Sequence, residues 1–296
     1  QHWELTIEDA KAKGAVVQTN SWGFDTNVPI TQISDYAEAN SITNYESLVA
    51  HQAISTTGVM GNTGLYDTSF SNYVVNWTVT EWQELIAAYN DFQNQGIIVW
   101  AGSNYGALGT PYGRATNEAD SSSGLPYLFP ELAEAWISVI NVTPTGSAYI
   151  INSGPCGTSG PYCLSHDGYQ TTAGIAVTGE GSWYQSMTGT SMATPQVAGA
   201  VALLFEAFPD NSPEEIAKRL LLTANNSWFN SNFCYLAAEG DNDNPCGGYD
   251  GTVTYNGISH QYSNIYGHGS ADLSAALRPI GSRTVKNGLQ KFALPM

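Results

Sequence analysis

The run Ile-Ile-Val-Trp-Ala at 97–101 constrains the fold more than any other stretch of this chain. A strand that is apolar on both faces must be covered on both faces, which is the situation of a strand inside a parallel sheet. The segment before it, 80–94, carries apolar residues at the spacing of one helical face: Trp82, Leu85, Ile86 and Tyr89. The sequence therefore predicts a helix over 80–94 that packs on a buried strand.

The same alternation of helix and strand recurs along the chain. We expect further apolar strands at 15–23, 135–143 and 172–177, and further helices at 6–14, after Ser191 and from Pro213. Thr6 and Asp9 form an acidic variant of a capping box, and Gly14 is a suitable residue to end that helix. Ser212 and Glu215 form a second capping box, with proline at the first helical position. This alternation predicts an α/β fold with a mostly parallel sheet.

Three stretches lack the pattern. We interpret 24–78 as a long surface insertion with one helix, 225–262 as an irregular region and 281–296 as a linker or exit segment. We expect residues 1–280 to form a single domain that includes the first two of these stretches.

The charge balance argues against one broad class of partner. The chain has 26 acidic and 9 basic residues, which gives a net charge of −17. Because binding to nucleic-acid phosphates requires clusters of lysine and arginine, we expect no nucleic-acid partner. Solubility is the simplest role for this charge, and a preference for cationic substrates is the alternative.

The four cysteines fall as two close pairs, Cys156 with Cys163 and Cys234 with Cys246. Neither pair has the two-residue spacing of a zinc or redox motif. Two loop-closing disulfides are the simplest interpretation, although four cysteines allow three full pairings and four free thiols are the alternative. Disulfides imply an oxidising compartment. The chain has no apolar run of 18 residues and no signal peptide at 1–11, so an export signal would precede residue 1.

Ser191 stands directly before an apolar helical segment, in Gly-Thr-Ser-Met-Ala-Thr-Pro at 189–195. At this place the first amide hydrogens of a helix and its positive dipole end can stabilise a developing anion. A lone serine in this position is more often a helix N-cap, which is the structural alternative.

The stretch 189–195, followed by Val-Ala-Gly-Ala-Val-Ala-Leu-Leu, resembles the nucleophile motif of the subtilisin-like serine proteases. The resemblance implies a subtilisin-like three-layer α/β fold, peptide or protein substrates, and a role for Ser191 as a nucleophile activated by a histidine. An esterase using the same serine is disfavoured because the Gly-x-Ser-x-Gly elbow is absent.

The resemblance extends to two further segments. In Ala-Gly-Ser-Asn-Tyr-Gly at 101–106 it implies that Asn104 stabilises the tetrahedral oxyanion, although Ser103 stands where the family has glycine. A turn asparagine is the alternative. Ser21, Trp22 and Gly23 resemble the edge segment that pairs with the substrate backbone, and a core position is the alternative for Trp22. Ala101, Gly102 and Ser103 would form the other wall of the substrate pocket.

A narrower resemblance links the chain to the passenger proteases of bacterial autotransporters. It rests on 125–142, on the cysteine loop with Cys-Leu-Ser-His-Asp-Gly, and on 267–281. Residues 165–168, Ser-His-Asp-Gly, depart from the Ala-Pro-Gly turn of that group. The resemblance implies a secreted or cell-surface bacterial protein, with a C-terminal membrane barrel in the full-length protein.

The other members of a catalytic triad have no match in this sequence. The family places its aspartate in Asp-Thr-Gly or Asp-Ser-Gly and its histidine in His-Gly-Thr-His, and neither segment occurs here. The resemblance therefore covers only the C-terminal part of the catalytic domain. Its N-terminal strands and helices are missing, and we expect Asp and His upstream of residue 1. A partner chain that supplies them and an inactive peptide-binding or structural relative are the alternatives.

None of the five histidines replaces that base: His2, His51, His166, His260 and His268. His166 lies in a Ser-His-Asp run, but adjacent residues of an extended chain point to opposite sides. We expect His268 to be structural. We expect no cofactor and no metal site. Asp241 and Asp243 could bind calcium, but their spacing does not fit an EF-hand, which favours an acidic surface loop.

Overall fold

The computed structural model describes residues 3–22, 30–39, 41, 43, 79–104, 119–120, 122–145, 148–174, 184–229, 249–278, 283–287 and 290–294. Several predicted positions lie outside these residues: Gly23, His2, His51, Cys234, Cys246, Asp241 and Asp243. The expected second disulfide and the calcium alternative fall on these residues and therefore stay predictions.

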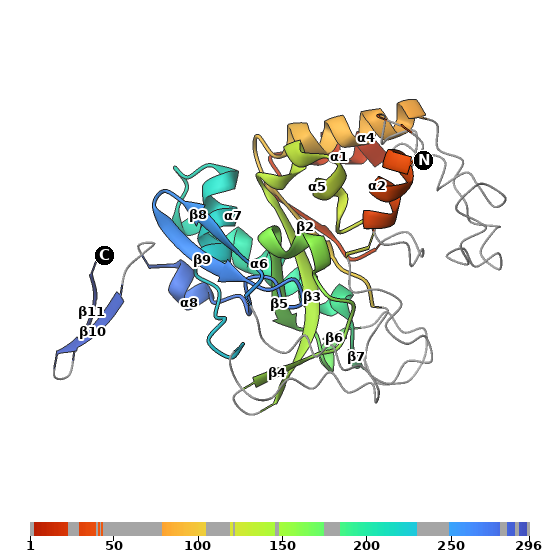
Figure 1. Ribbon diagram of the computed structural model, residues 1–296. Coiled ribbons are helices and arrows are strands. Elements are labelled where there is room, and N and C mark those ends of the chain that lie inside the picture. The colour runs from red at the N-terminus through yellow and green to blue at the C-terminus, as the bar shows by residue number, and fades with distance from the viewer. Residues whose placement is uncertain are drawn as a thin grey trace, which may run out of the picture.

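The described chain alternates helices and strands (Figure 1). The helices are α1 (Trp3–Ala12), α2 (Ile30–Ala39), α4 (Val79–Phe92), α5 (Leu125–Leu128), α6 (Thr190–Ala207), α7 (Pro213–Leu222) and α8 (Leu273–Ala276), with the 3-10 helices η3 (Pro130–Ala133) and η4 (Gly157–Tyr162). The strands are β1 (Val17–Asn20), β2 (Ile97–Ala101), β3 (Trp136–Thr145), β4 (Ala148–Ile151), β5 (Cys163–Asp167), β6 (Thr171–Gly174), β7 (Tyr184–Met187), β8 (Gly251–Tyr255), β9 (Ile258–Tyr262), β10 (Arg283–Asn287) and β11 (Gln290–Leu294). None of the helices in this part of the chain is long and apolar enough to cross a membrane.

The central sheet is mostly parallel. Strands β1, β2 and β3 lie side by side in parallel, and β5 pairs in parallel with β3. Strand β4 adds an antiparallel pairing at the end of β3. Every residue of β2 is buried, so the predictions of strands at 97–101 and 135–143 are confirmed, as is the α/β fold.

Helices cover both faces of this sheet, and the alternation of side chains along the strands decides which helix each residue meets. Ile98 and Trp100 of β2 belong to the core beneath α1 and α4, whereas Ile97 and Val99 belong to the core beneath α6 and α7. Figure 1 shows α1 and α4 together on one side of the strands. The predicted apolar face of α4 is confirmed, since all four of its named residues are buried: Trp82, Leu85, Ile86 and Tyr89.

The first helix begins earlier than predicted, at Trp3, so Thr6 is not its N-cap and the capping-box prediction there is wrong. The Trp3 ring lies 3.8 Å from that of Trp22 between centroids, and the Asp9 carboxylate pairs with Lys13 one turn later. Gly14 ends this helix with φ +82°, a conformation that glycine adopts without strain. The second predicted capping box, of Ser212 and Glu215, is confirmed on α7.

The strand predicted at 172–177 does not join the central sheet over its described residues, 172–174. Residues 171–174 form β6, which pairs with β7 in a separate two-stranded sheet. The place beside β3 is taken by β5, whose run Cys-Leu-Ser-His-Asp carries too little apolar character to signal a buried strand. Cys163, Leu164 and Ser165 are nevertheless buried, because β5 lies beside β3 in the central sheet.

The three stretches outside the predicted alternation contain regular structure, and the helix expected within 24–78 is present as α2. Within the predicted surface insertion, α2 places Ile30 and Ala37 in the core, so this part is not a surface segment. The region 225–262 contains the β8–β9 hairpin, and the predicted linker contains the β10–β11 hairpin. Asn256-Gly257 joins β8 to β9 with φ of 49° and 79°, and this Asn-Gly pair was the available signal for a two-residue hairpin turn.

A disulfide joins Cys156 and Cys163 across η4, with their Cα atoms 6.0 Å apart. Cys163 is the first residue of β5, and it is fully buried. The bond therefore holds the loop of η4 against the central sheet.

We predict that two glycines of positive φ respond differently to alanine. A Cβ at Gly257 meets no atom within 4 Å, so Gly257→Ala should lower the free energy of unfolding by only about 1–2 kcal/mol, the cost of the left-handed backbone. A Cβ at Gly267 would overlap the backbone carbonyl of Cys163, so Gly267→Ala should cost at least about 3 kcal/mol. Urea denaturation of both variants measures the difference, and equal costs would contradict this packing.

Candidate functional site

Ser191 lies in the first turn of α6, as its second helical residue. Helix α6 begins at Thr190, two residues earlier than expected, and Gly189 is the N-cap without a side-chain hydrogen bond. The alternative in which Ser191 caps the helix is therefore wrong. The side chain of Ser191 is half-buried, whereas that of Thr190 is buried.

Ser191 meets the end of β1 through a reciprocal pair of hydrogen bonds. Its Oγ donates to the backbone oxygen of Ser21 at 3.2 Å, and the Ser21 Oγ donates to the backbone oxygen of Ser191 at 3.1 Å. The two residues are 170 positions apart in the sequence. The structure thus brings the predicted nucleophile and the predicted substrate-binding edge into contact.

Asn104 lies just after β2 and reaches the start of α6. Its Oδ1 accepts the backbone N–H of Thr190 at 2.8 Å and lies 3.0 Å from the Thr190 Oγ1. The same hydroxyl lies 2.7 Å from the backbone oxygen of Gly102, so it can donate its single proton either to that oxygen or to the Asn104 Oδ1. Because Oδ1 faces a backbone N–H, the Nδ2 group is the end of the amide that remains for other acceptors.

Two N–H donors at this helix terminus find no acceptor among the residues described: Asn104 Nδ2 and the backbone N–H of Ser191. The next amides, of Met192 and Ala193, both bond to the Gly189 oxygen at 3.0 and 3.3 Å. The first turn of a helix also carries partial positive charge. The two free donors and the dipole can stabilise negative charge that develops on an oxygen beside Ser191.

A second layer of contacts supports this turn. Asn141, fully buried in the middle of β3, accepts the backbone N–H of Gly168 at 2.8 Å through its Oδ1. The Gly168 oxygen accepts the N–H of Gly189 at 3.1 Å. A Cβ on Gly168 would overlap the Gly189 oxygen, and a Cβ on Gly189 would lie 3.1 Å from the Asn104 Oδ1. A side chain at Gly168 would displace the turn that carries Ser191, and one at Gly189 would press on the Asn104 amide.

Sequence reasoning missed Asn141 and Thr190 as parts of this site. Asn141 gave one signal, since it is a polar residue in the middle of the apolar run Trp-Ile-Ser-Val-Ile-Asn-Val. Thr190 lies within the quoted motif at 189–195, but its contact with Asn104, 86 residues away, had no signal in that segment.

The predicted walls of the substrate pocket take different positions. Ala101 is buried in β2, and the backbone oxygens of Gly102 and Ser103 accept from the Thr190 hydroxyl and from the N–H of Gly154. Trp22 is half-buried, with its ring centroid 5.0 Å from that of Trp100, so it also packs on the core. These contacts agree with the core alternative for Trp22, and its role in substrate binding stays a prediction.

No histidine in the described ranges hydrogen-bonds to the Ser191 hydroxyl. Burial lowers the pKa of His166, and its Nδ1 has no partner within these residues. Nor do the described residues contain a cluster of three or more His, Cys, Asp or Glu side chains that could hold a metal ion.

His268 is fully buried at the end of β5 and packs against a second histidine. Its Nε2 lies 3.1 Å from the Pro161 oxygen, and its Nδ1 lies 3.0 Å from the Nδ1 of His260. Burial, reinforced by the neighbouring His260, lowers the pKa of His268 to about 3. These contacts agree with the structural role expected for this residue.

The chain matches one family model over most of its length. The model of the subtilase family matches residues 3–269. An extracellular serine protease of Serratia marcescens is 27% identical over 146 residues, which cover 43% of this chain and 13% of that protein.

Solved structures similar to this chain include two proteases. Fervidolysin, a keratinolytic enzyme related to subtilisin from Fervidobacterium pennivorans, has 21% identity and a TM-score of 0.42, over 66% of this chain and 24% of that chain. The prenylagaramide maturation protease PagA has 14% identity and a TM-score of 0.48, over 93% of this chain and 65% of that chain. The chain thus spans only part of each of these proteins.

We predict that His268 makes folding sensitive to acid. Its pKa in the folded protein, about 3, lies below the ordinary value of 6.5, so the folded state binds this proton more weakly than the unfolded chain. The free energy of unfolding should therefore fall as the pH decreases from about 6.5 towards 3. NMR titration of the His268 ring and urea denaturation of wild type and His268→Gln across this range test the prediction. A ring that titrates near pH 6.5, or parallel stability curves, would contradict it.

Proposed function

The chain belongs to the subtilase family, and we propose that it is the serine-bearing part of an endopeptidase that cleaves peptide bonds through an acyl-enzyme on Ser191. The observation that carries this proposal is the geometry around α6. The Ser191 hydroxyl stands in the first turn of the helix, and Asn104 bonds the preceding residue, Thr190, through its Oδ1, which leaves its Nδ2 for another acceptor.

The chemistry follows from these positions. The Ser191 Oγ attacks the carbonyl carbon of the substrate, and its proton passes to a histidine base. The new C–O bond moves an electron pair onto the carbonyl oxygen, where Asn104 Nδ2–H and the Ser191 N–H stabilise the negative charge. The histidine then protonates the leaving amine as the C–N bond breaks. Water hydrolyses the resulting ester and restores the serine.

The base and its carboxylate are proposed to come from a segment or chain outside residues 1–296. Two observations support this. The sequence lacks the family's Asp and His segments, and the Ser191 hydroxyl donates to the Ser21 carbonyl. Within the part of the chain that is described, β1 pairs with β2 alone. A parallel strand on the other edge of β1 would bring its carboxyl end close to Ser21 and Ser191.

Extracellular proteins and peptides are the proposed substrates. The disulfide between Cys156 and Cys163 supports a compartment outside the reducing cytosol. The match to a bacterial extracellular protease supports the same location.

We expect no covalent labelling of Ser191 by a fluorophosphonate when this chain is tested alone, because no base activates the hydroxyl. Addition of the polypeptide encoded upstream should produce stoichiometric labelling at Ser191, measured by intact mass and peptide mapping. Ser191→Ala should abolish it, whereas Ser274→Ala, at an exposed serine of α8, should not.

Labelling of the isolated chain at Ser191 would contradict the proposed external base. Absence of labelling with the upstream polypeptide, together with retained binding of peptides, would favour the inactive relative that keeps a peptide-binding groove.

In the reconstituted protein, Asn104→Ala should lower kcat by roughly a hundred- to a thousand-fold with a smaller effect on KM, because the amide acts on the charged intermediate. Thr190→Val should lower kcat by about tenfold, since it removes the hydroxyl beside the Asn104 Oδ1 but leaves the backbone N–H.

Thr194→Val is the matched control, because this buried threonine bonds only to the Thr190 oxygen within the same helix. Its kcat should stay within about twofold of wild type. Equal losses in Thr190→Val and Thr194→Val would indicate a general disturbance of α6 instead of positioning of Asn104.

A further inference from the structure

Helix α6 contains a proline four residues after Ser191, at position 195. In an α-helix the backbone N–H of residue 195 would donate to the backbone oxygen of residue 191. Proline has no N–H, and its ring crowds the carbonyl four residues earlier. The Ser191 carbonyl therefore cannot receive the helical hydrogen bond that belongs to its position, and it needs a different donor.

Ser21 supplies a donor to this carbonyl. Its Oγ donates to the Ser191 oxygen at 3.1 Å, from a residue 170 positions earlier in the sequence. A serine hydroxyl has a single proton, so this bond uses its whole capacity to donate. The Ser21 side chain thus takes the place of the N–H group that Pro195 lacks.

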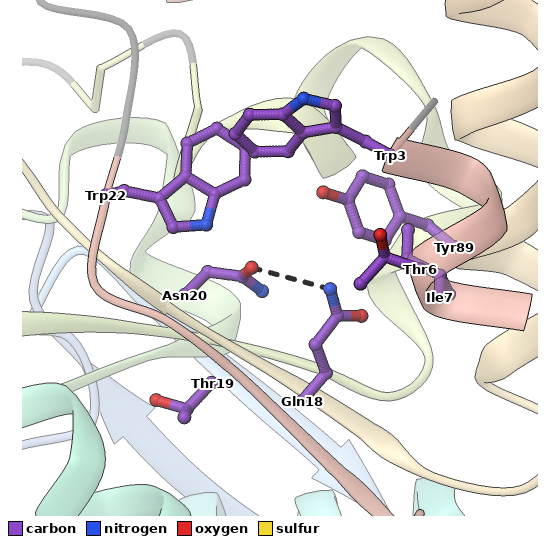
Figure 2. Close-up of a pocket in the computed structure, with 8 residues that line it drawn as sticks. All are labelled: Trp3, Thr6, Ile7, Gln18, Thr19, Asn20, Trp22 and Tyr89. Atoms are coloured by element: carbon purple, nitrogen blue, oxygen red, sulfur yellow. Dashed lines mark hydrogen bonds between the residues drawn. The ribbon is translucent and has the colours of Figure 1, made fainter. Parts of the chain in front are cut away.

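The segment that carries Ser21 is held by the residues on both sides of it. Asn20 is 3% exposed and accepts the Gln18 Nε2 at 3.4 Å through its Oδ1. Trp22 packs on the core beneath α1 and α4, and Figure 2 shows its indole beside that of Trp3. Successive side chains of an extended segment point to opposite sides, so Ser21 faces α6 while its neighbours face the aromatic core. Its hydroxyl is therefore presented to α6 from an anchored backbone.

The bond from Ser21 acts on the part of Ser191 that does not react. The Ser191 Oγ donates to the Ser21 oxygen at 3.2 Å, and in the proposed reaction this hydroxyl donates to a base instead. The Ser191 carbonyl takes no part in that chemistry, so its bond with the Ser21 Oγ can persist while the hydroxyl changes partner. The bond holds the peptide unit that follows Ser191, and the direction of the Ser191 side chain depends on this unit.

We propose that Ser21 is a positioning residue for Ser191, and that its hydroxyl replaces the helical donor removed by Pro195. The role of Ser191 as a nucleophile rests on the proposed function, whereas the replacement of the donor rests on the geometry alone. The Ser21 side chain thereby has a task that is distinct from the substrate pairing expected of its backbone.

A double-mutant cycle between Ser21 and Pro195 tests the proposal without any catalysis. Pro195→Ala gives position 195 an N–H that can bond to the Ser191 oxygen, and the proline is exposed, so its removal leaves no cavity. We expect Ser21→Ala to raise the unfolding equilibrium constant of the chain roughly fivefold when Pro195 is present, and by less than about twofold in Pro195→Ala protein. Urea denaturation measures these constants, and the ¹³C signal of the Ser191 carbonyl should shift on Ser21→Ala only when Pro195 is present.

Kinetics of the protein reconstituted with the upstream polypeptide test the positioning role. Ser21→Ala should lower kcat about five- to tenfold and leave KM within about twofold of wild type, because the hydroxyl orients the nucleophile and does not contact the substrate. In the Pro195→Ala background the same substitution should change kcat by less than about twofold. Ser21→Thr keeps the hydroxyl and should stay within about threefold of wild type.

Ser34→Ala is the matched control. The Ser34 hydroxyl also donates to a backbone oxygen, that of Thr31 at 2.8 Å, but within α2. Its removal should raise the unfolding constant by the same factor with and without Pro195, and it should leave kcat within about twofold of wild type.

Equal losses on Ser21→Ala in the two backgrounds, no loss in either, or a raised KM with unchanged kcat would overturn the proposal. The last of these outcomes would indicate that the side chain binds substrate. Because the unfolding cycle and the carbonyl signal need no catalysis, they separate the two proposals. Failure of Ser191 labelling with this coupling intact would remove the peptidase and leave the replacement of the donor, and labelling without the coupling would do the opposite.

Discussion

The hydrogen bond from the Thr190 N–H to the Asn104 Oδ1 is the contact on which the site depends. It joins the carboxyl end of β2 to the first residue of α6, and it satisfies one of the amides that a helix start leaves without a partner. The same bond fixes which end of the Asn104 amide faces outward. One interaction therefore begins the helix, attaches it to the sheet and aims a donor at the place where charge would develop.

The surrounding sequence is adapted to that contact. Gly168 and Gly189 have no side chain because the turn and the Asn104 amide occupy the space, and Asn141 holds Gly168 from inside β3. The candidate catalytic residues therefore lie between the carboxyl end of β2 and the start of α6, and Asn141 of the buried strand β3 supports them. The two residues after β1 face different surroundings. Ser21 contacts Ser191, and Trp22 packs on the aromatic core.

Sequence reasoning performed best where one stretch contained the whole signal. The buried strand 97–101 and the four apolar residues of α4 were predicted correctly because periodicity and burial are local properties. It failed at 172–174 and at β5, because apolar content favoured the first of these segments for the central sheet and the structure uses the second. Strand β5 is buried because it pairs with β3, although its own residues are only partly apolar. No local pattern in its sequence therefore predicts a buried strand.

The α/β class, the buried strand β2 and the choice of Ser191 and Asn104 as candidate catalytic residues could all be predicted from the sequence, because they depend on local spacing and on contiguous motifs. Tertiary packing brings Ser21 into contact with Ser191 across 170 residues and places the Thr190 hydroxyl beside the Asn104 Oδ1. Such features arise when segments distant in the chain pack together, and the free energy of burying each group depends on neighbours that its own segment does not specify.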